Sequence, residues 1–148
     1  MSRWPLTLAS CVLATALAIP TAARASHEIQ NLLERINHHR AALGLPTLKW
    51  DDRLAAVARR HSNDMVRRQF FDHVNPDGDD PFVRMEHAGI RYSAAGENLA
   101  SGQTTGAQVF EGWMRSRGHR RNLENRDFTR IGLAVSQRRW TCLLSRPR

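Results

Sequence analysis

FTRIGLAVSQRRWTCLL, residues 128–144, is the stretch of sequence that decides the fold class. Its two halves, 128–135 and 139–144, are rich in β-branched, aromatic and aliphatic residues, as is typical of strands. The polar segment 136–138 separates them, so the stretch predicts a β-hairpin. Helical patterns dominate the chain upstream. Helices first and strands mostly last predict an α+β fold in which helices pack on an antiparallel sheet.

Four helices are predicted upstream of the hairpin from apolar residues at helical spacing and from capping residues. Their expected starts are Ser26, Asp51 or Asp52, Asp80 and Thr105. Gly44 and Pro46 are expected to end the first helix. Residues 72–78 form a predicted loop, and residues 93–101 are expected to form a short strand or an extended loop. We see no internal repeat or linker, so these elements are expected to form one domain.

Residues 1–25 have the pattern of an export signal: a basic start at Arg3, a mostly apolar run over 6–19, and the cleavage pattern Ala23-Arg24-Ala25. Cleavage after Ala25 would leave a domain of residues 26–148 in the periplasm or outside the cell. The apolar run is short for a bilayer span, which argues against a transmembrane anchor. Lipoprotein anchoring at Cys11 is the weaker alternative, because Cys11 lies inside the apolar run rather than at its end.

The 148 residues include 22 Lys+Arg and 14 Asp+Glu, which gives a formal charge of +8, and loss of Arg3 and Arg24 with the signal lowers it to +6. The basic residues are scattered and no nucleic-acid motif accompanies them, so nucleic acid is not an expected partner. Gly-rich phosphate loops, paired-cysteine metal motifs, His-Glu-x-x-His and Gly-x-Ser-x-Gly are all absent from the sequence. Nucleotide hydrolases, zincins and common serine hydrolases therefore lose their usual support.

Three ionisable residues fall outside the predicted helix stripes: His73 in a turn-rich loop, Glu97 beside a glycine, and His119 after Gly118. Loops on a rigid scaffold often carry function. From residue types alone, a shared site and ordinary hydrogen-bonded surface residues both stay open. His61 lies on the apolar stripe of the second helix and is expected to be a core histidine. Cys142, the single cysteine after residue 25, is expected to be buried in a strand.

Six ordered motifs resemble those of the CAP superfamily, which comprises cysteine-rich secretory proteins, antigen 5 and pathogenesis-related 1 proteins. The similarity is to its small bacterial secreted branch. The motifs are Leu45-Pro46-x-Leu48, Leu54-x3-Ala58-x2-His61-Ser62-x-Asp64-Met65, Phe70-Phe71-Asp72-His73-x2-Pro76-Asp77-Gly78, Gly96-Glu97-Asn98-x-Ala100, Trp113-Met114-x-Ser116-x-Gly118-His119-Arg120-x-Asn122-Leu123 and Phe128-Thr129-x-Ile131-Gly132-x-Ala134. The resemblance implies an α-β-α sandwich with helices around a central antiparallel sheet.

The resemblance also implies a site. Family members carry two His and two Glu in a central cleft, and in some the two His bind a divalent metal such as zinc. The motifs assign these positions to His73, Glu97 and His119, as candidate catalytic residues, with His73 and His119 as candidate metal ligands. The second Glu of animal and plant members corresponds to Ser116, and Glu111 lies about 140° away around the helix. The expected site is therefore a triad.

Two function classes follow. The favoured one is a secreted binding module whose cleft holds a divalent metal, a small molecule, a lipid or an envelope component. The alternative is a metal-assisted hydrolase of peptide or cell-envelope material, which the missing carboxylate disfavours. Glu97 either serves the metal chemistry directly or orients a histidine ring.

Basic side chains surround His119 and, with Ser116, are candidates for a ligand-binding rim. They are Arg115, Arg117, Arg120 and Arg121. One interpretation is a cationic rim that attracts an anionic ligand. The other, which we favour, is a solvated helix end where cations complement the helix dipole.

Overall fold

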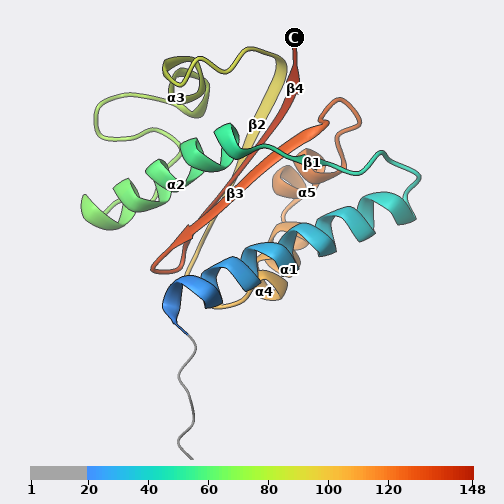
Figure 1. Cartoon of the computed structure of the whole chain (residues 1–148), viewed down its shortest axis with the longest axis horizontal. Helices are drawn as coiled ribbons and strands as arrows, with labels where there is room; N and C mark the ends of the chain where they lie inside the picture. Colours follow the sequence, from blue (N-terminus) through green and yellow to red (C-terminus); the bar gives the residue numbers. More distant parts are fainter. Residues whose placement is uncertain (1–19) are drawn as a thin grey trace, which may run out of the picture.

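The middle layer of the protein is a four-stranded sheet in the order β1-β3-β4-β2, as seen in a computed structural model that describes residues 20–148 (Figure 1). The strands are β1 (Lys49–Trp50), β2 (Tyr92–Ser101), β3 (Arg130–Ser136) and β4 (Arg139–Pro147). Strand β4 pairs antiparallel with both β2 and β3, whereas the two-residue β1 runs parallel to β3. Most of the predicted export signal and the alternative at Cys11 lie outside the described residues.

The predicted hairpin is confirmed as β3 and β4, joined by Gln137 and Arg138. These two residues have φ angles of 40° and 64°. Positive φ at both central positions is what a two-residue hairpin turn of type I′ requires, because its twist then matches that of the strands. The turn is therefore one residue shorter than the polar segment had indicated, and it forms without the Asn-Gly pair that usually favours it.

Helices cover both faces of the sheet (Figure 1). One face carries α1 (Thr21–Ala42), α4 (Gly106–Arg115) and α5 (Arg117–Glu124), and the other carries α2 (Asp52–Arg67) and α3 (Pro81–His87). We call these the α1–α4–α5 layer and the α2–α3 layer. The predicted α-β-α sandwich is confirmed. The helix that was expected to include Ser116 ends instead at Arg115, and α5 follows as a separate helix that the sequence patterns did not indicate.

Three of the predicted helix starts are confirmed by their caps. The Asp51 carboxylate accepts hydrogen bonds from the backbone N–H groups of Arg53 and Leu54, the first turn of α2. Asp80 caps α3 and Thr105 caps α4 in the same way. Each cap satisfies N–H groups that have no partner inside the helix.

The predicted start of the first helix at Ser26 is wrong. Helix α1 begins at Thr21, and the Ser26 hydroxyl donates to the backbone oxygen of Ala22 inside the helix. Residues 21–25 include three alanines, the best helix formers, so nothing in them interrupts the helix. The helix thus passes through the predicted cleavage position. No helix in residues 20–148 is long and apolar enough to cross a membrane.

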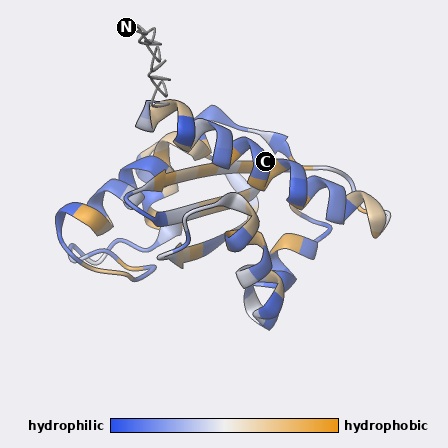
Figure 2. Ribbon diagram, turned by 90° about the horizontal axis from the view of Figure 1, so that it is seen from below, coloured by the Kyte–Doolittle hydropathy of each residue, from blue (hydrophilic) through white to orange (hydrophobic). Residues whose placement is uncertain are grey.

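Each layer has its own apolar cluster against the sheet, and hydrophobic residues gather in the strands and in the helix segments that face them (Figure 2). Gly132 in β3 allows the close approach of α2. A Cβ atom added there would lie 2.2 Å from the backbone nitrogen of Ala55, so the strand and the helix meet through backbone atoms. Cys142 is fully buried, as predicted, and burial raises the pKa of its thiol.

Candidate functional site

The candidate site lies along β2, which is an edge strand of the sheet. Successive side chains of a strand point to opposite faces. Glu97 pairs with Leu143, which belongs to the cluster of the α2–α3 layer. Asn98 pairs with Cys142, which belongs to the cluster of the α1–α4–α5 layer. Neighbouring residues of this edge strand therefore present a carboxylate to one layer and an amide to the other.

The Glu97 carboxylate is almost fully buried, with 1% of its side chain exposed. His73 Nδ1 lies 2.8 Å from Glu97 Oε1, and Arg84 Nη2 donates to Glu97 Oε2 at 2.6 Å. A buried carboxylate needs charged or hydrogen-bonding partners, and here each oxygen has one. Both oxygens of Glu97 are thus engaged in holding protein groups.

His73 comes from the loop between α2 and α3, and half of its side chain is exposed. Its Nδ1–H donates to Glu97, which leaves Nε2 as the ring nitrogen free to meet a ligand. The hydrogen bond to Glu97 raises the pKa of His73 above its usual value. The charged imidazolium form therefore persists to a higher pH than in a free histidine.

Arg84 on α3 is the residue of this site that the sequence analysis missed. Besides its bond to Glu97, its Nη1 donates to the backbone oxygens of His73, at 2.6 Å, and Asp79, at 2.9 Å. Arg84 thereby fixes the carboxylate and the histidine loop at once. The only signal in the sequence is a single arginine in a predicted short helix, and that does not indicate which partner it meets.

His119 reaches the same strand from the opposite layer, on α5. Asn98 Nδ2 donates to the backbone oxygen of His119 at 3.0 Å, and Asn122 Nδ2 donates to Asn98 Oδ1 at 2.9 Å. Burial lowers the pKa of His119, and the positive charge of His73 lowers it further. The His119 backbone is thus joined to the residue next to Glu97 in β2, and the charge of His73 acts on the His119 ring.

Among the described residues the Glu97 carboxylate hydrogen-bonds to His73 but not to the His119 ring. The His119 ring lies instead beside the Trp113 ring, with centroids 6.5 Å apart. The structure thus brings His73 and Glu97 into direct contact and places His119 next to them. His61, by contrast, is 1% exposed, and its Nε2 lies 2.9 Å from the Asp72 carbonyl oxygen, as expected for a core histidine.

The predicted rim lies at the junction of α4 and α5. Ser116 is the residue between the two helices, and its side chain makes no capping hydrogen bond. Arg115 lies in the last turn of α4 and Arg121 in the last turn of α5, where a cation complements the helix dipole. Arg117 is at the start of α5, where the dipole opposes a positive charge. Arg120 is half-exposed, with Nε 3.9 Å from Glu124 Oε2.

The model of the CAP family, described as the cysteine-rich secretory protein family, matches residues 33–144. The chain belongs to the CAP family. Its CAP domain is 42% identical over 104 residues to a Bacillus subtilis protein named "Uncharacterized protein YkwD", covering 70% of this chain and 40% of YkwD. It is 36% identical over 112 residues to the B. subtilis "Uncharacterized membrane protein YlbC", covering 76% of this chain and 32% of YlbC. The chain thus spans less than half the length of these relatives.

Solved structures show the same fold. An extracellular protein containing an SCP domain from Bacillus anthracis is 30% identical with a TM-score of 0.81, over 88% of this chain and 45% of that one. An outer surface protein from Borrelia burgdorferi is 24% identical with a TM-score of 0.76, over 82% of this chain and 94% of that one. The second similarity concerns the fold alone.

The residues of this CAP site fit a three-ligand metal centre poorly. Both Glu97 oxygens already hold protein groups, so the carboxylate is not free to bind an ion. Within residues 20–148 no group of three or more His, Cys, Asp or Glu side chains is arranged to hold a metal. Two imidazoles remain as donors, whereas zinc centres use three or four protein ligands. Glu97 matches the role of a residue that orients a histidine ring.

Proposed function

We propose that this CAP domain is an exported, non-catalytic binding module, and that its ligand contacts His73 Nε2 and His119 at the edge of β2. The ligand class is a small molecule, a lipid or an envelope component. Export is supported by the similarity to an extracellular protein from Bacillus anthracis. A divalent ion such as zinc would have only these two imidazoles as protein ligands, so we expect it to bind weakly there.

One observation carries this proposal: both oxygens of Glu97 are occupied by His73 and Arg84. A hydrolase needs a group that is free to take a proton from water. Glu97 lacks a free oxygen for that task, and the second carboxylate of the animal and plant pattern is replaced by Ser116. The cluster is therefore better suited to holding a ligand than to activating water.

A hydrolase remains the second candidate because of one feature. His73 is half-exposed and hydrogen-bonded through Nδ1 to a buried carboxylate, which is how a general base is oriented in many enzymes. In that case His73 Nε2 would take the proton from water. The same pair of residues thus serves either function, and experiment separates them.

Native mass spectrometry of the untagged protein tests the binding module. We expect a ligand adduct that survives chelation, is lost in His73→Ala and His119→Ala, and is kept in His38→Ala. His38 is an exposed histidine on α1 and serves as the matched control. The proposal fails if peptide or envelope substrates are turned over and both chelator and either site substitution abolish that turnover in folded protein.

Zinc titration at two pH values tests the two histidines as metal ligands. Only neutral imidazole binds a metal. The pKa of His73 is raised, so protons compete with zinc for this ring up to a higher pH than at a free histidine. Zinc affinity should therefore be weaker at about pH 5 than at about pH 7.5. Isothermal calorimetry measures the difference. Equal affinity at the two values would exclude His73 and His119 as the ligands.

A further inference from the structure

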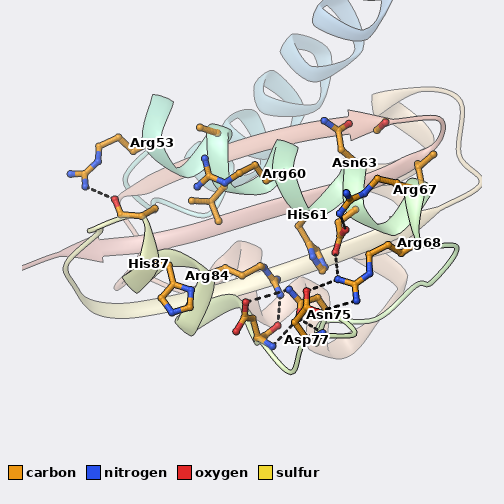
Figure 3. Close-up of a pocket in the computed structure, with 17 residues that line it drawn as sticks. Arg53, Arg60, His61, Asn63, Arg67, Arg68, Asn75, Asp77, Arg84 and His87 are labelled. Atoms are coloured by element: carbon orange, nitrogen blue, oxygen red, sulfur yellow. Dashed lines mark hydrogen bonds and ion pairs between the residues drawn. The ribbon is translucent and has the colours of Figure 1, made fainter.

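A second candidate binding site lies between α2, α3 and the loop that joins them (Figure 3). This pocket has a volume of about 1040 Å³, at the upper end of the range for small-molecule sites. Neither His73, Glu97 nor His119 lines it. Arg84 lines the pocket and also contacts Glu97, so the two sites share one residue of their walls.

Arginines line the pocket along α2. Arg53, Arg60 and Arg67 are seven residues apart, so they lie on one face of the helix, about 10 Å from one to the next. Figure 3 shows them following the helix in this order. Arg53 donates to the backbone oxygens of Ala88 and Gly89, and Arg67 pairs with Asp64 at 2.7 Å. Arg60, in the middle, is exposed and has no hydrogen bond or ion pair among the described residues.

The charge of the lining favours an anion. Five arginines line the pocket against three aspartates, a formal charge of +2, although one of the arginines, Arg84, is paired with Glu97 outside the lining. Asp64 and Asp77 are already paired with Arg67 and Arg68, which leaves Arg60 as the cation without a protein partner in the part of the chain that is described. A guanidinium presents two parallel N–H groups that match a phosphate or a carboxylate.

Two buried residues of the lining add a second kind of contact. His61 is 1% exposed and the Arg84 side chain 9% exposed, yet His61 Nδ1 and Arg84 Nε have no partner among the described residues. The other ring nitrogen, Nε2, donates to Asp72, so Nδ1 of the neutral ring is an acceptor. Burial and the nearby charge of Arg84 lower the pKa of His61, which keeps the ring neutral. Arg84 Nε is a donor.

One acceptor and one donor are the complement of a hydroxyl group, which donates one hydrogen bond and accepts another. Figure 3 places His61 and Arg84 next to each other on the lining, below the row of α2 arginines. We propose that this pocket binds an anion that also carries hydroxyl groups, a polyol phosphate or a sugar acid, with its charged group at Arg60 and a hydroxyl at His61 and Arg84. The proposal is independent of the ligand at His73 and His119.

NMR titration of the full chain with four small probes tests this assignment. Glycerol 3-phosphate and glucuronate carry charge and hydroxyls, ethyl phosphate carries charge without free hydroxyls, and glycerol carries hydroxyls without charge. We expect saturable shifts on α2 and α3 with at least one hydroxylated anion, about tenfold tighter than with ethyl phosphate or glycerol. Tighter binding of glycerol 3-phosphate would identify the anionic group as a phosphate, and tighter binding of glucuronate would identify it as a carboxylate.

Arg60→Gln should weaken that binding about tenfold. Arg59→Gln is the matched control, because Arg59 is exposed, belongs to the same helix and does not line the pocket. It should change the affinity by less than about twofold. The proposal is overturned if neither hydroxylated anion binds by about 10 mM, if ethyl phosphate binds equally well, if both variants lose affinity alike, or if the shifts centre on His73 and His119.

Discussion

The two helical layers of this CAP domain differ in what they bury. The α1–α4–α5 layer packs large apolar side chains on the sheet, among them Ile36 and Trp113. Its buried cation, Arg40, donates to four backbone carbonyl oxygens, those of Pro46, Leu123, Asn125 and Phe128. The α2–α3 layer has a smaller apolar cluster and buries His61, Ser62 and Glu97 beside it.

The difference separates stability from function. The buried cation of the first layer, Arg40, has all its partners within the protein, and that layer contributes mainly packing free energy. In the second layer His61 Nδ1 and Arg84 Nε remain without a protein partner, and Glu97 holds a half-exposed histidine. Groups of this kind are where ligands are met. We therefore expect substitutions in the α1–α4–α5 layer to affect mainly stability and substitutions in the α2–α3 layer to affect mainly ligand binding.

The largest effect on stability is expected in the α1–α4–α5 layer. Ile36→Ala removes a fully buried side chain of α1 and should lower the free energy of unfolding by about 2–5 kcal/mol, because a cavity remains. Urea unfolding measures this loss. The matched control is Leu43→Ala at the end of the same helix, where the side chain is 50% exposed and the change should stay within about 0.5 kcal/mol. Equal losses in the two variants would show that the burial of Ile36 does not stabilise this layer.

A smaller effect on stability is expected in the α2–α3 layer. Ser62 Oγ and Thr141 Oγ1 are buried and 2.8 Å apart, so Ser62→Ala leaves the threonine hydroxyl unpaired, at a cost of about 1–3 kcal/mol. The double variant Ser62→Ala/Thr141→Val removes both partners and should recover part of that loss. Strictly additive losses in urea unfolding would show that the hydrogen bond is not what stabilises this contact.

Local signals predicted much of the fold. Caps at Asp51, Asp80 and Thr105 start helices because a side-chain oxygen next to a helical pattern acts within a few residues. The hairpin followed from composition on either side of a polar turn. The parallel β1 was not predictable, because a two-residue strand exists only through its pairing with β3. The start of α1 was misplaced because the residues before Ser26 favour a helix as well.

The candidate site was predicted in part. Motifs marked His73, Glu97 and His119, and the structure joins His73 to Glu97 and the His119 backbone to Asn98, the next residue of β2. The role of Arg84 depends on the orientation of α3 relative to β2, which no local pattern encodes. The pairing of Glu97 with His73 rather than His119 likewise follows from which face of the strand each residue occupies. These tertiary contacts determine whether the Glu97 carboxylate is free to bind a ligand or orients the His73 ring.

The central claim is that Glu97 holds the His73 ring through Nδ1 and leaves Nε2 for a ligand. A nitrogen-15 NMR titration of the histidine rings in the unmodified protein tests it directly. The account predicts that the pKa of His73 lies above that of a free histidine and the pKa of His119 below it. It also predicts that neutral His73 carries its proton on Nδ1. A His73 pKa at or below that of His119, or a neutral His73 protonated on Nε2, would contradict the account.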